Sequence, residues 1–234
     1  MKQINETTFT SDNGLITFIH GDCMKFMAGC CEKEFDLAVV DPPYGIKASD
    51  YKRGNTKYGK AKTKSKNYGL KNWDDSSPKS EYWDKLFFIS NNQIVFGANH
   101  FISKIPFDSS SWIVWNKENG DNGYADCELA WTSFTSAVRM FTWKWQGMLQ
   151  QNMKNKQERI HVTEKPIALY RWIFKNYAKP TDHILDTHGG SMSSAIAAHM
   201  EGLKMTIIEL DKEYFDKAIQ RFSIYERQQT INFE

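Results

Sequence analysis

Short apolar runs alternate along the chain with segments whose apolar residues follow helical spacing. Residues 15–20 form a β-rich run that ends at Gly21-Asp22, and residues 36–40 form a continuous apolar run that Pro42-Pro43 ends. A run that is apolar at nearly every position is typical of a strand buried on both faces. Further strands are expected over residues 93–97, 111–116, 127–133, 183–186 and 204–209.

Between and after these strands, the apolar residues recur at the spacing of helices. One predicted helix begins at Ser80, a second covers residues 165–177, and a third runs from Ser193 to about Glu201. Asp211 can cap a last helix whose buried face comprises Phe215, Ala218, Ile219 and Phe222. Strands that alternate with helices predict a single α/β domain over residues 1–234, built on a doubly wound, mostly parallel sheet.

Composition narrows the class of protein. Of the 234 residues, 41% are hydrophobic and 25% are charged, which is typical of a globular domain. The apolar runs are too short to span a bilayer, and the first residues lack the apolar core of a signal peptide. Four scattered cysteines without CxxC spacing favour reduced thiols in a cytoplasmic protein, and indicate neither a zinc site nor a disulfide framework.

The charge is concentrated in one segment. Residues 47–71 hold nine basic residues and one acid, although the whole chain carries only +2. This composition, with several glycines and no apolar period, predicts a long basic loop over residues 45–79 that contacts a polyanion. A solvated insertion is the alternative. The predicted DNA contacts in this loop are Lys47, Lys52, Arg53, Lys57, Lys60, Lys62, Lys64 and Lys66.

The C-terminal part of the sequence has the order of a nucleoside-cofactor site. A strand ends at Asp186, a turn holds Gly189-Gly190, a helix follows, and the next strand ends at Glu209. Glycines let the backbone approach a ligand, and an acid at the end of the neighbouring strand can hold two ribose hydroxyls. A simple turn between strand and helix is the alternative. The GxGxxG pattern is absent, which disfavours a nicotinamide dehydrogenase.

A second motif, Asp41-Pro42-Pro43-Tyr44, directly follows the apolar strand. Two successive prolines force the chain out of the sheet in a rigid turn, at the strand end where open α/β sheets bind ligands. A carboxylate, a free Pro42 carbonyl and an aromatic ring suit a planar heterocycle with an exocyclic amine. A proline-terminated strand with a packed tyrosine is the alternative.

These segments together resemble the DNA adenine-N6 methyltransferases that use S-adenosylmethionine, in the permuted class whose DPPY precedes the cofactor loop. The resemblance extends from about Leu15 to Phe222, through IHGDCM, DLAVVDPPYG, QIVFGANHF, CELAWTSF, HVTEKPIALYRWI and ILDTHGGS. It implies a Rossmann-like methyltransferase fold, S-adenosylmethionine as cofactor, and DNA as the substrate.

The resemblance also implies roles for individual residues. Asp22 would contact the adenine of the cofactor, and Thr163, Lys165 and Pro166 would lie near its methionine part. The catalytic residues it implies are Asp41, Pro42, Pro43 and Tyr44. The implied cofactor-binding residues are Asp22, Cys23, Asp41, Thr163, Lys165, Pro166, Asp186, Thr187, His188, Gly189, Gly190, Ser191, Glu209 and Leu210. No metal is implied.

The cofactor loop departs from the commonest family pattern at three positions. Thr187 and His188 replace Pro-Phe, and Met192 replaces the last glycine. Because methionine carries a Cβ, we expect a right-handed backbone at Met192 or a shifted loop. For His188 a packing role in place of phenylalanine is favoured over cofactor contact or proton transfer.

The function expected is site-specific methylation of N6 on a flipped-out adenine. Asp41 and the Pro42 carbonyl would accept the two N–H bonds of the amine, and Tyr44 would stack on the base. Cytosine-N4 methylation is the nearest alternative, although Asp rather than Ser before Pro-Pro-Tyr favours adenine by resemblance. A nucleic-acid-binding homologue without catalysis is another, and the altered cofactor loop is its support.

Base recognition is expected in residues 139–164, which are basic and aromatic and include the predicted DNA contacts Arg139 and Lys144. A surface hairpin with packing tryptophans is the alternative. The expected partners are DNA and S-adenosylmethionine, with homodimer formation left open and no membrane. The expected location is the cytoplasm of a bacterial or phage-infected cell, in association with the nucleoid. Whether a partner restriction enzyme exists is left open.

Overall fold

The computed structural model describes residues 1–46, 74–120, 125–146, 149–154, 156–157, 159–161 and 163–231. The loop predicted over residues 45–79 therefore lies mostly outside the described residues, and so do its eight predicted DNA contacts from Lys47 to Lys66.

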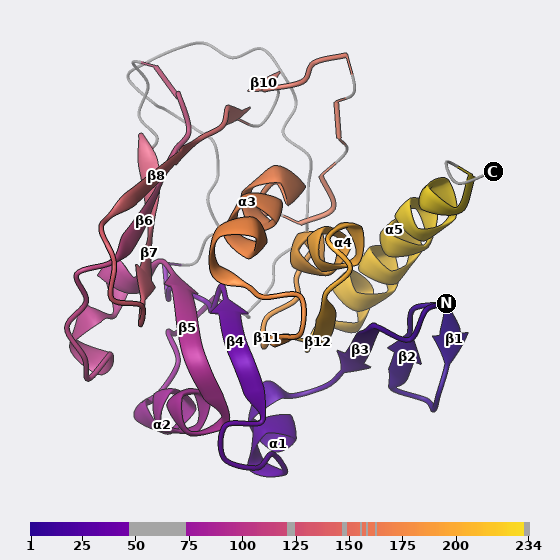
Figure 1. Ribbon diagram of the computed structural model, residues 1–234, viewed down its shortest axis with the longest axis horizontal. Coiled ribbons are helices and arrows are strands. Elements are labelled where there is room, and N and C mark those ends of the chain that lie inside the picture. The colour runs from indigo at the N-terminus through magenta and orange to yellow at the C-terminus, as the bar shows by residue number, and fades with distance from the viewer. Residues whose placement is uncertain are drawn as a thin grey trace.

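The strands are those of a large mixed sheet (Figure 1). In chain order they are β1 (Lys2–Gln3), β2 (Thr8–Thr10), β3 (Ile16–His20), β4 (Phe35–Val40), β5 (Ser90–Phe96), β6 (Trp112–Asn116), β7 (Cys127–Thr132), β8 (Arg139–Thr142), β9 (Trp145–Gln146), β10 (Leu149–Gln150), β11 (His183–Asp186) and β12 (Lys204–Glu209). Within the described residues, ten of them form one sheet in the order β1-β2-β3-β12-β11-β4-β5-β7-β6-β8, and β9 and β10 form a separate hairpin.

The centre of this sheet is parallel. Strands β3, β12, β11, β4 and β5 pair in parallel, whereas β2 and β7 pair antiparallel with their neighbours. The predicted strands at residues 183–186 and 204–209 have the bounds expected, while β5 ends at Phe96 rather than Gly97, which has a positive φ of 65°.

The helices are α1 (Cys23–Ala28), α2 (Ser80–Ile89), the 3-10 helices η2 (Ala98–His100) and η3 (Ile102–Lys104), α3 (Ile167–Tyr177), α4 (Ser193–Met200) and α5 (Lys212–Ile231). They cover both faces of the sheet, as Figure 1 shows, with α1 and α2 on one side and α3, α4 and α5 on the other. Strand β4 explains why: Leu37 and Val39 pack on the α3–α5 side, whereas Ala38 and Val40 pack on the α1–α2 side. A strand buried on both faces requires this doubly wound arrangement.

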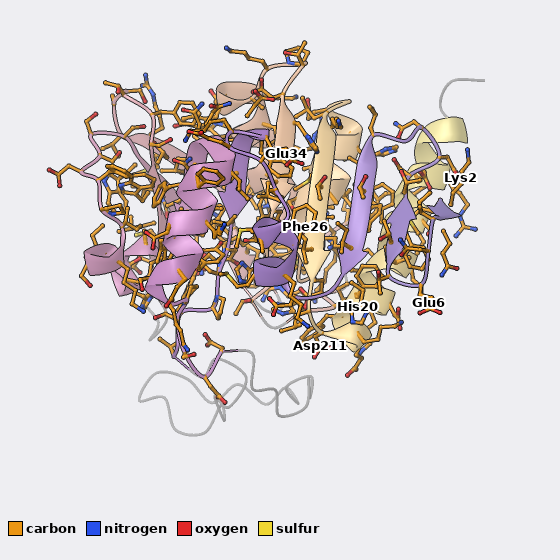
Figure 2. All side chains as sticks on the ribbon, turned by 90° about the horizontal axis from the view of Figure 1, so that it is seen from below. Lys2, Glu6, His20, Phe26, Glu34 and Asp211 are labelled. Carbon is orange, nitrogen blue, oxygen red and sulfur yellow. The ribbon has the colours of Figure 1, made fainter. Side chains whose placement is uncertain are left out.

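The parallel strands all finish at one edge of the sheet. His20 at the end of β3 is in register with Glu209 at the end of β12. Figure 2 shows His20 and Asp211 together at this edge, while Glu34, which precedes β4, lies at the opposite one. Because β4 and β11 are adjacent, the segments that follow Val40 and Asp186 emerge side by side. In the described part of the chain no helix is long and apolar enough to cross a membrane.

Candidate cofactor and active site

A cavity of about 170 Å³ lies at the edge where the parallel strands end. Its walls combine the segment after β3, the turn after β4, residues 161–165, the loop between β11 and α4, and the end of β12. Twelve of the fourteen predicted cofactor-binding residues line it: Asp22, Cys23, Asp41, Thr163, Lys165, Thr187, His188, Gly189, Gly190, Ser191, Glu209 and Leu210. Segments that are up to 188 residues apart in the chain thus meet at one place.

Pro166 and Asp186 are the predicted cofactor residues that do not line this cavity. Pro166 is buried at the start of α3. Asp186 is 2% exposed, and its carboxylate accepts hydrogen bonds from the backbone N–H of His188 (3.0 Å) and the hydroxyl of Ser194 (2.6 Å). Asp186 therefore stabilises the conformation of the loop through these hydrogen bonds. Burial raises the pKa of its carboxyl to about 7.

The loop after β11 lies tightly against β12. The N–H of Gly189 donates to the carbonyl of Ile208 at 2.7 Å, and a Cβ on Gly189 would lie 3.0 Å from the side chain of Ile207. A larger residue would require the side chain of Ile207 or the loop to shift, so glycine allows the close approach seen here.

Met192 ends this loop with a left-handed backbone, at φ 55° and ψ 32°. The expectation that methionine would exclude positive φ here is wrong. The side chain of Met192 is fully buried among α3 and α4 residues of the core. Burial of a methionine contributes about 1.5–3 kcal/mol, which offsets the cost of about 1–2 kcal/mol for the left-handed conformation.

Glu209 holds the loop from the next strand. One carboxylate oxygen accepts from the N–H of Gly190 and the other from the N–H of Asp211, both at 2.7 Å. Burial raises the pKa of this carboxyl, and these backbone donors counter the shift. A carboxylate oxygen can accept two hydrogen bonds, so each retains capacity for one hydroxyl at the cavity wall.

Asp22 has a structural role in addition to lining the cavity. Its carboxylate accepts from the N–H of Met24 at 2.8 Å and so caps α1. Cys23 follows on the same wall, and burial raises the pKa of its thiol to about 12, so the thiol stays protonated.

Asp41 also lines the cavity, and two donors hold its carboxylate. The hydroxyl of Tyr44 donates to its Oδ1 at 2.7 Å, and the ammonium of Lys165 forms a short ion pair with its Oδ2. Lys165 is 3% exposed and also lies 3.4 Å from Glu128 of β7. Burial works against its charge, but Asp41 and Glu128 together raise the pKa of Lys165. Asp41 is thus an oriented acceptor beside a buried cation.

Tyr44 packs against two parts of the sheet edge. Its ring stacks on His100, with centroids 4.9 Å apart and planes within 15°, and its edge lies over Gly97. A Cβ at Gly97 would lie 2.1 Å from the ring, so this glycine creates the space that Tyr44 occupies. His100 covers one face of Tyr44.

Sequence reasoning missed several residues of this site. His161, Glu164, Tyr170 and Tyr214 line the cavity, and Glu128 holds Lys165. Glu164 pairs with Arg221 of α5 at 3.2 Å, while Arg221 donates to the carbonyl of Ser191 at 2.9 Å. The available signal in the sequence was Arg221, a charged residue next to the apolar face predicted for the last helix.

The segment predicted to read bases, residues 139–164, is partly tied to the core. Trp145 is 5% exposed, and its Nε1 donates to the carbonyl of Glu164 at 2.7 Å, while the guanidinium of Arg159 lies over its ring at 4.9 Å. Trp145 therefore packs, as the alternative interpretation held. Lys144 follows the end of β8 at the cavity edge of the sheet, whereas Arg139 begins β8, three residues from that end.

Among the described residues no group of three or more His, Cys, Asp or Glu side chains is placed to hold a metal ion.

Comparison with known proteins shows a likeness to DNA methylases. A family profile described as DNA methylase matches residues 134–220, which contain α3, the cofactor loop, β12 and the first part of α5. Residues 134–220 are thus similar to the N6/N4 DNA methylases.

Relatives of the whole chain agree with this DNA methylase match. The type II methyltransferase M.HinfI of Haemophilus influenzae is 22% identical over 88% of this chain and 68% of its own length. The putative methylase YubD of Escherichia coli K12 is 22% identical over 90% of this chain and 91% of its own.

Solved DNA methylase structures share the fold. The M1.HpyAVI–SAM complex superposes with a TM-score of 0.56, at 21% identity, over 88% of this chain and 99% of its own. The cytosine-N4-specific PvuII DNA methyltransferase gives 0.57, at 12% identity, over 97% and 96%. The predicted Rossmann-like methyltransferase fold is confirmed.

Proposed function

We propose that this protein transfers the methyl group of S-adenosylmethionine to the N6 amine of an adenine in DNA. The observation that carries the proposal is that Asp41, Pro43, the Thr187–Ser191 loop and Glu209 all line the same cavity. An amine acceptor and a nucleoside site thus face the same space.

The cavity suits S-adenosylmethionine by its donors and acceptors. The carboxylates of Asp22, Asp41 and Glu209 line it, while Lys165, a cation on the same wall, is paired with Asp41 and Glu128. An acidic lining attracts a sulfonium cation, and Glu209 has acceptor capacity for ribose hydroxyls. When bound, the cofactor supplies an electrophilic methyl group.

The chain's own residues position the amine. Asp41, oriented by Tyr44 and Lys165, accepts one N–H of the amine, and the Pro42 carbonyl accepts the other, which directs the nitrogen lone pair toward the cavity. Tyr44, whose ring stacks on His100, is the aromatic side chain that would stack on a flipped base. Because the ammonium of Lys165 already engages Asp41, positioning and charge orientation dominate over proton removal by this carboxylate.

Mass analysis of nucleosides tests the proposal directly. DNA treated with purified protein and S-adenosylmethionine is digested, and we expect N6-methyladenine. N4-methylcytosine instead would favour cytosine-N4 methylation, the reaction for which the PvuII enzyme of similar fold is specific. Binding of DNA with no modified base and no S-adenosylmethionine binding would favour a non-catalytic homologue.

The substitution Asp41→Asn tests the acceptor. It keeps the size but loses the charge that Lys165 and Tyr44 orient, so single-turnover methyl transfer should fall about 10²–10³-fold. Asp84→Asn, the same change on the exposed face of α2, is the control and should leave the rate unchanged. Turnover of Asp41→Asn within twofold of the wild type would remove Asp41 from the reaction.

A further inference from the structure

A chain of three hydrogen-bonding side chains connects helix α2 to the cofactor loop. The hydroxyl of Tyr82, on α2, lies 2.7 Å from Oγ1 of Thr187, and Oγ1 of Thr187 lies 2.9 Å from Nδ1 of His188. The rings of Tyr82 and His188 also meet edge to face, with centroids 5.4 Å apart. Thr187 and His188 stand where the commonest family loop has Pro-Phe, which offers no such chain.

The burial of Tyr82 determines which of the two hydroxyl groups, that of Tyr82 or that of Thr187, is the donor. Tyr82 is 3% exposed, and Thr187 is its hydrogen-bond partner among the described residues. If Thr187 donated to Tyr82, the phenol hydrogen would be buried without an acceptor, which costs about 1–3 kcal/mol. Tyr82 therefore donates to Thr187, which leaves the single hydroxyl hydrogen of Thr187 available for Nδ1 of His188.

This direction determines the tautomer of His188. A neutral imidazole that accepts at Nδ1 carries its hydrogen at Nε2. Burial lowers the pKa of His188 to about 4, so the ring is neutral near pH 7. Its Nε2 has no hydrogen-bond partner within the described residues, and the side chain lines the cavity.

We propose that Tyr82 and Thr187 are positioning residues that fix His188 as a neutral Nε2–H donor to an acceptor atom of the bound cofactor. This inference rests on the proposed function, since it takes S-adenosylmethionine as the ligand. A neutral donor suits the site because a cationic imidazolium would repel a sulfonium in the same cavity. His188 then binds the cofactor, instead of only packing in the place of a phenylalanine.

The tautomer is measured on the protein without cofactor. Long-range proton–nitrogen NMR spectra of protein with ¹⁵N-labelled histidine rings separate the Nε2–H form from the Nδ1–H form. We expect His188 to be a single Nε2–H form at pH 7, with a hydroxyl proton of Thr187 that exchanges slowly. An Nδ1–H form, or a mixture of the two, would overturn the assignment.

Binding of S-adenosylmethionine, measured by calorimetry, tests the donor. Glutamine places an N–H near the position of Nε2, whereas asparagine places its amide near Nδ1. His188→Gln should therefore bind within about threefold of the wild type, and His188→Asn should lose about tenfold, the loss of one hydrogen bond. Equal losses in the two variants would contradict a donor at Nε2.

Tyr82→Phe tests the positioning role. It keeps the ring against His188 but removes the hydrogen that orients Thr187, so affinity should fall about threefold to tenfold. The matched control is Tyr225→Phe on α5, away from the cavity, which should bind as the wild type does. An unchanged affinity in Tyr82→Phe would contradict the positioning role.

Failure of the inference and failure of the proposed function give different results. A wild-type protein that shows the Nε2–H form but neither binds S-adenosylmethionine nor methylates DNA overturns the function and with it the ligand. A protein that methylates DNA but shows the Nδ1–H form overturns only the role of His188.

Discussion

Met192 combines an unfavourable backbone with a favourable side chain. Its φ of 55° favours glycine, but its side chain is fully buried in the core. Met192→Gly should gain about 1 kcal/mol from the backbone and lose about 2–5 kcal/mol of packing, for a net loss of stability. Urea unfolding measures the difference.

A control isolates the backbone part of this prediction. Glu118 has a φ of 48° and is exposed, so Glu118→Gly relieves the same strain without the loss of a core side chain. It should be neutral or slightly stabilising. A Met192→Gly protein more stable than the wild type would mean that strain dominates at this position.

Glu209 connects the loop to the ligand site. In Glu209→Gln, one carboxylate oxygen becomes an NH₂ group that faces a backbone N–H, either that of Gly190 or that of Asp211. S-adenosylmethionine binding should weaken by about 1–3 kcal/mol, the usual cost of a lost hydrogen bond to a charged group. Calorimetry checks this, with Glu81→Gln on the exposed face of α2 as control. An unchanged dissociation constant would exclude Glu209 from the site.

At the scale of elements, α5 supports the cofactor loop through one arginine. Arg221 pairs with the buried Glu164 and donates to the carbonyl of Ser191 and the hydroxyl of Ser193. Arg221→Met leaves Glu164 buried without its cation and should cost about 3–5 kcal/mol in urea unfolding at pH 7.

The double variant Arg221→Met with Glu164→Gln decides whether the charge is the cause. Glutamine keeps the size and removes the unpaired charge, so the double variant should be more stable than Arg221→Met alone. Additive losses from the two changes would mean that the pair is not coupled.

The elements themselves could largely be predicted from the sequence, whereas part of the site could not. The strand at residues 36–40 and its Pro-Pro stop determine where Asp41 emerges, because apolar pattern and proline act locally. Glu128 and Arg221 depend on which distant elements pack together. The same holds for Tyr82, whose side chain reaches Thr187 across 105 residues. Met192 was misjudged because local backbone preference was weighed without the core packing that opposes it.

At the scale of the whole molecule, buried titratable groups set how stability varies with pH. Burial lowers the pKa of His161 from 6.5 to about 4, so between these values the unfolded chain binds a proton that the folded chain excludes. The contribution of His161 is present above pH 6.5 and is lost as the pH falls toward 4. Asp186 acts oppositely, since its raised pKa favours the folded state as the pH falls through 7.

Comparing the wild type with a variant that lacks His161 separates the effect of His161 on stability from that of Asp186. Between pH 7.5 and pH 5, the wild type should lose about 2 kcal/mol more than His161→Asn, which keeps an acceptor near Nδ1 for the N–H of Thr163. Urea unfolding at the two pH values gives both numbers. Parallel losses would show that His161 binds its proton equally well in the folded chain.

The order of strands in the sheet also governs when the protein can fold. Strand β4 lies beside β11, with Leu37 opposite Ile184, and β3 lies beside β12, with Phe18 opposite Ile207. During synthesis, β3 can pair with β2 and β4 with β5 early, but the other edge of each stays unpaired until β12 and β11 emerge. Such long-range pairing slows folding and leaves these apolar edges prone to aggregation until β11 and β12 have been made.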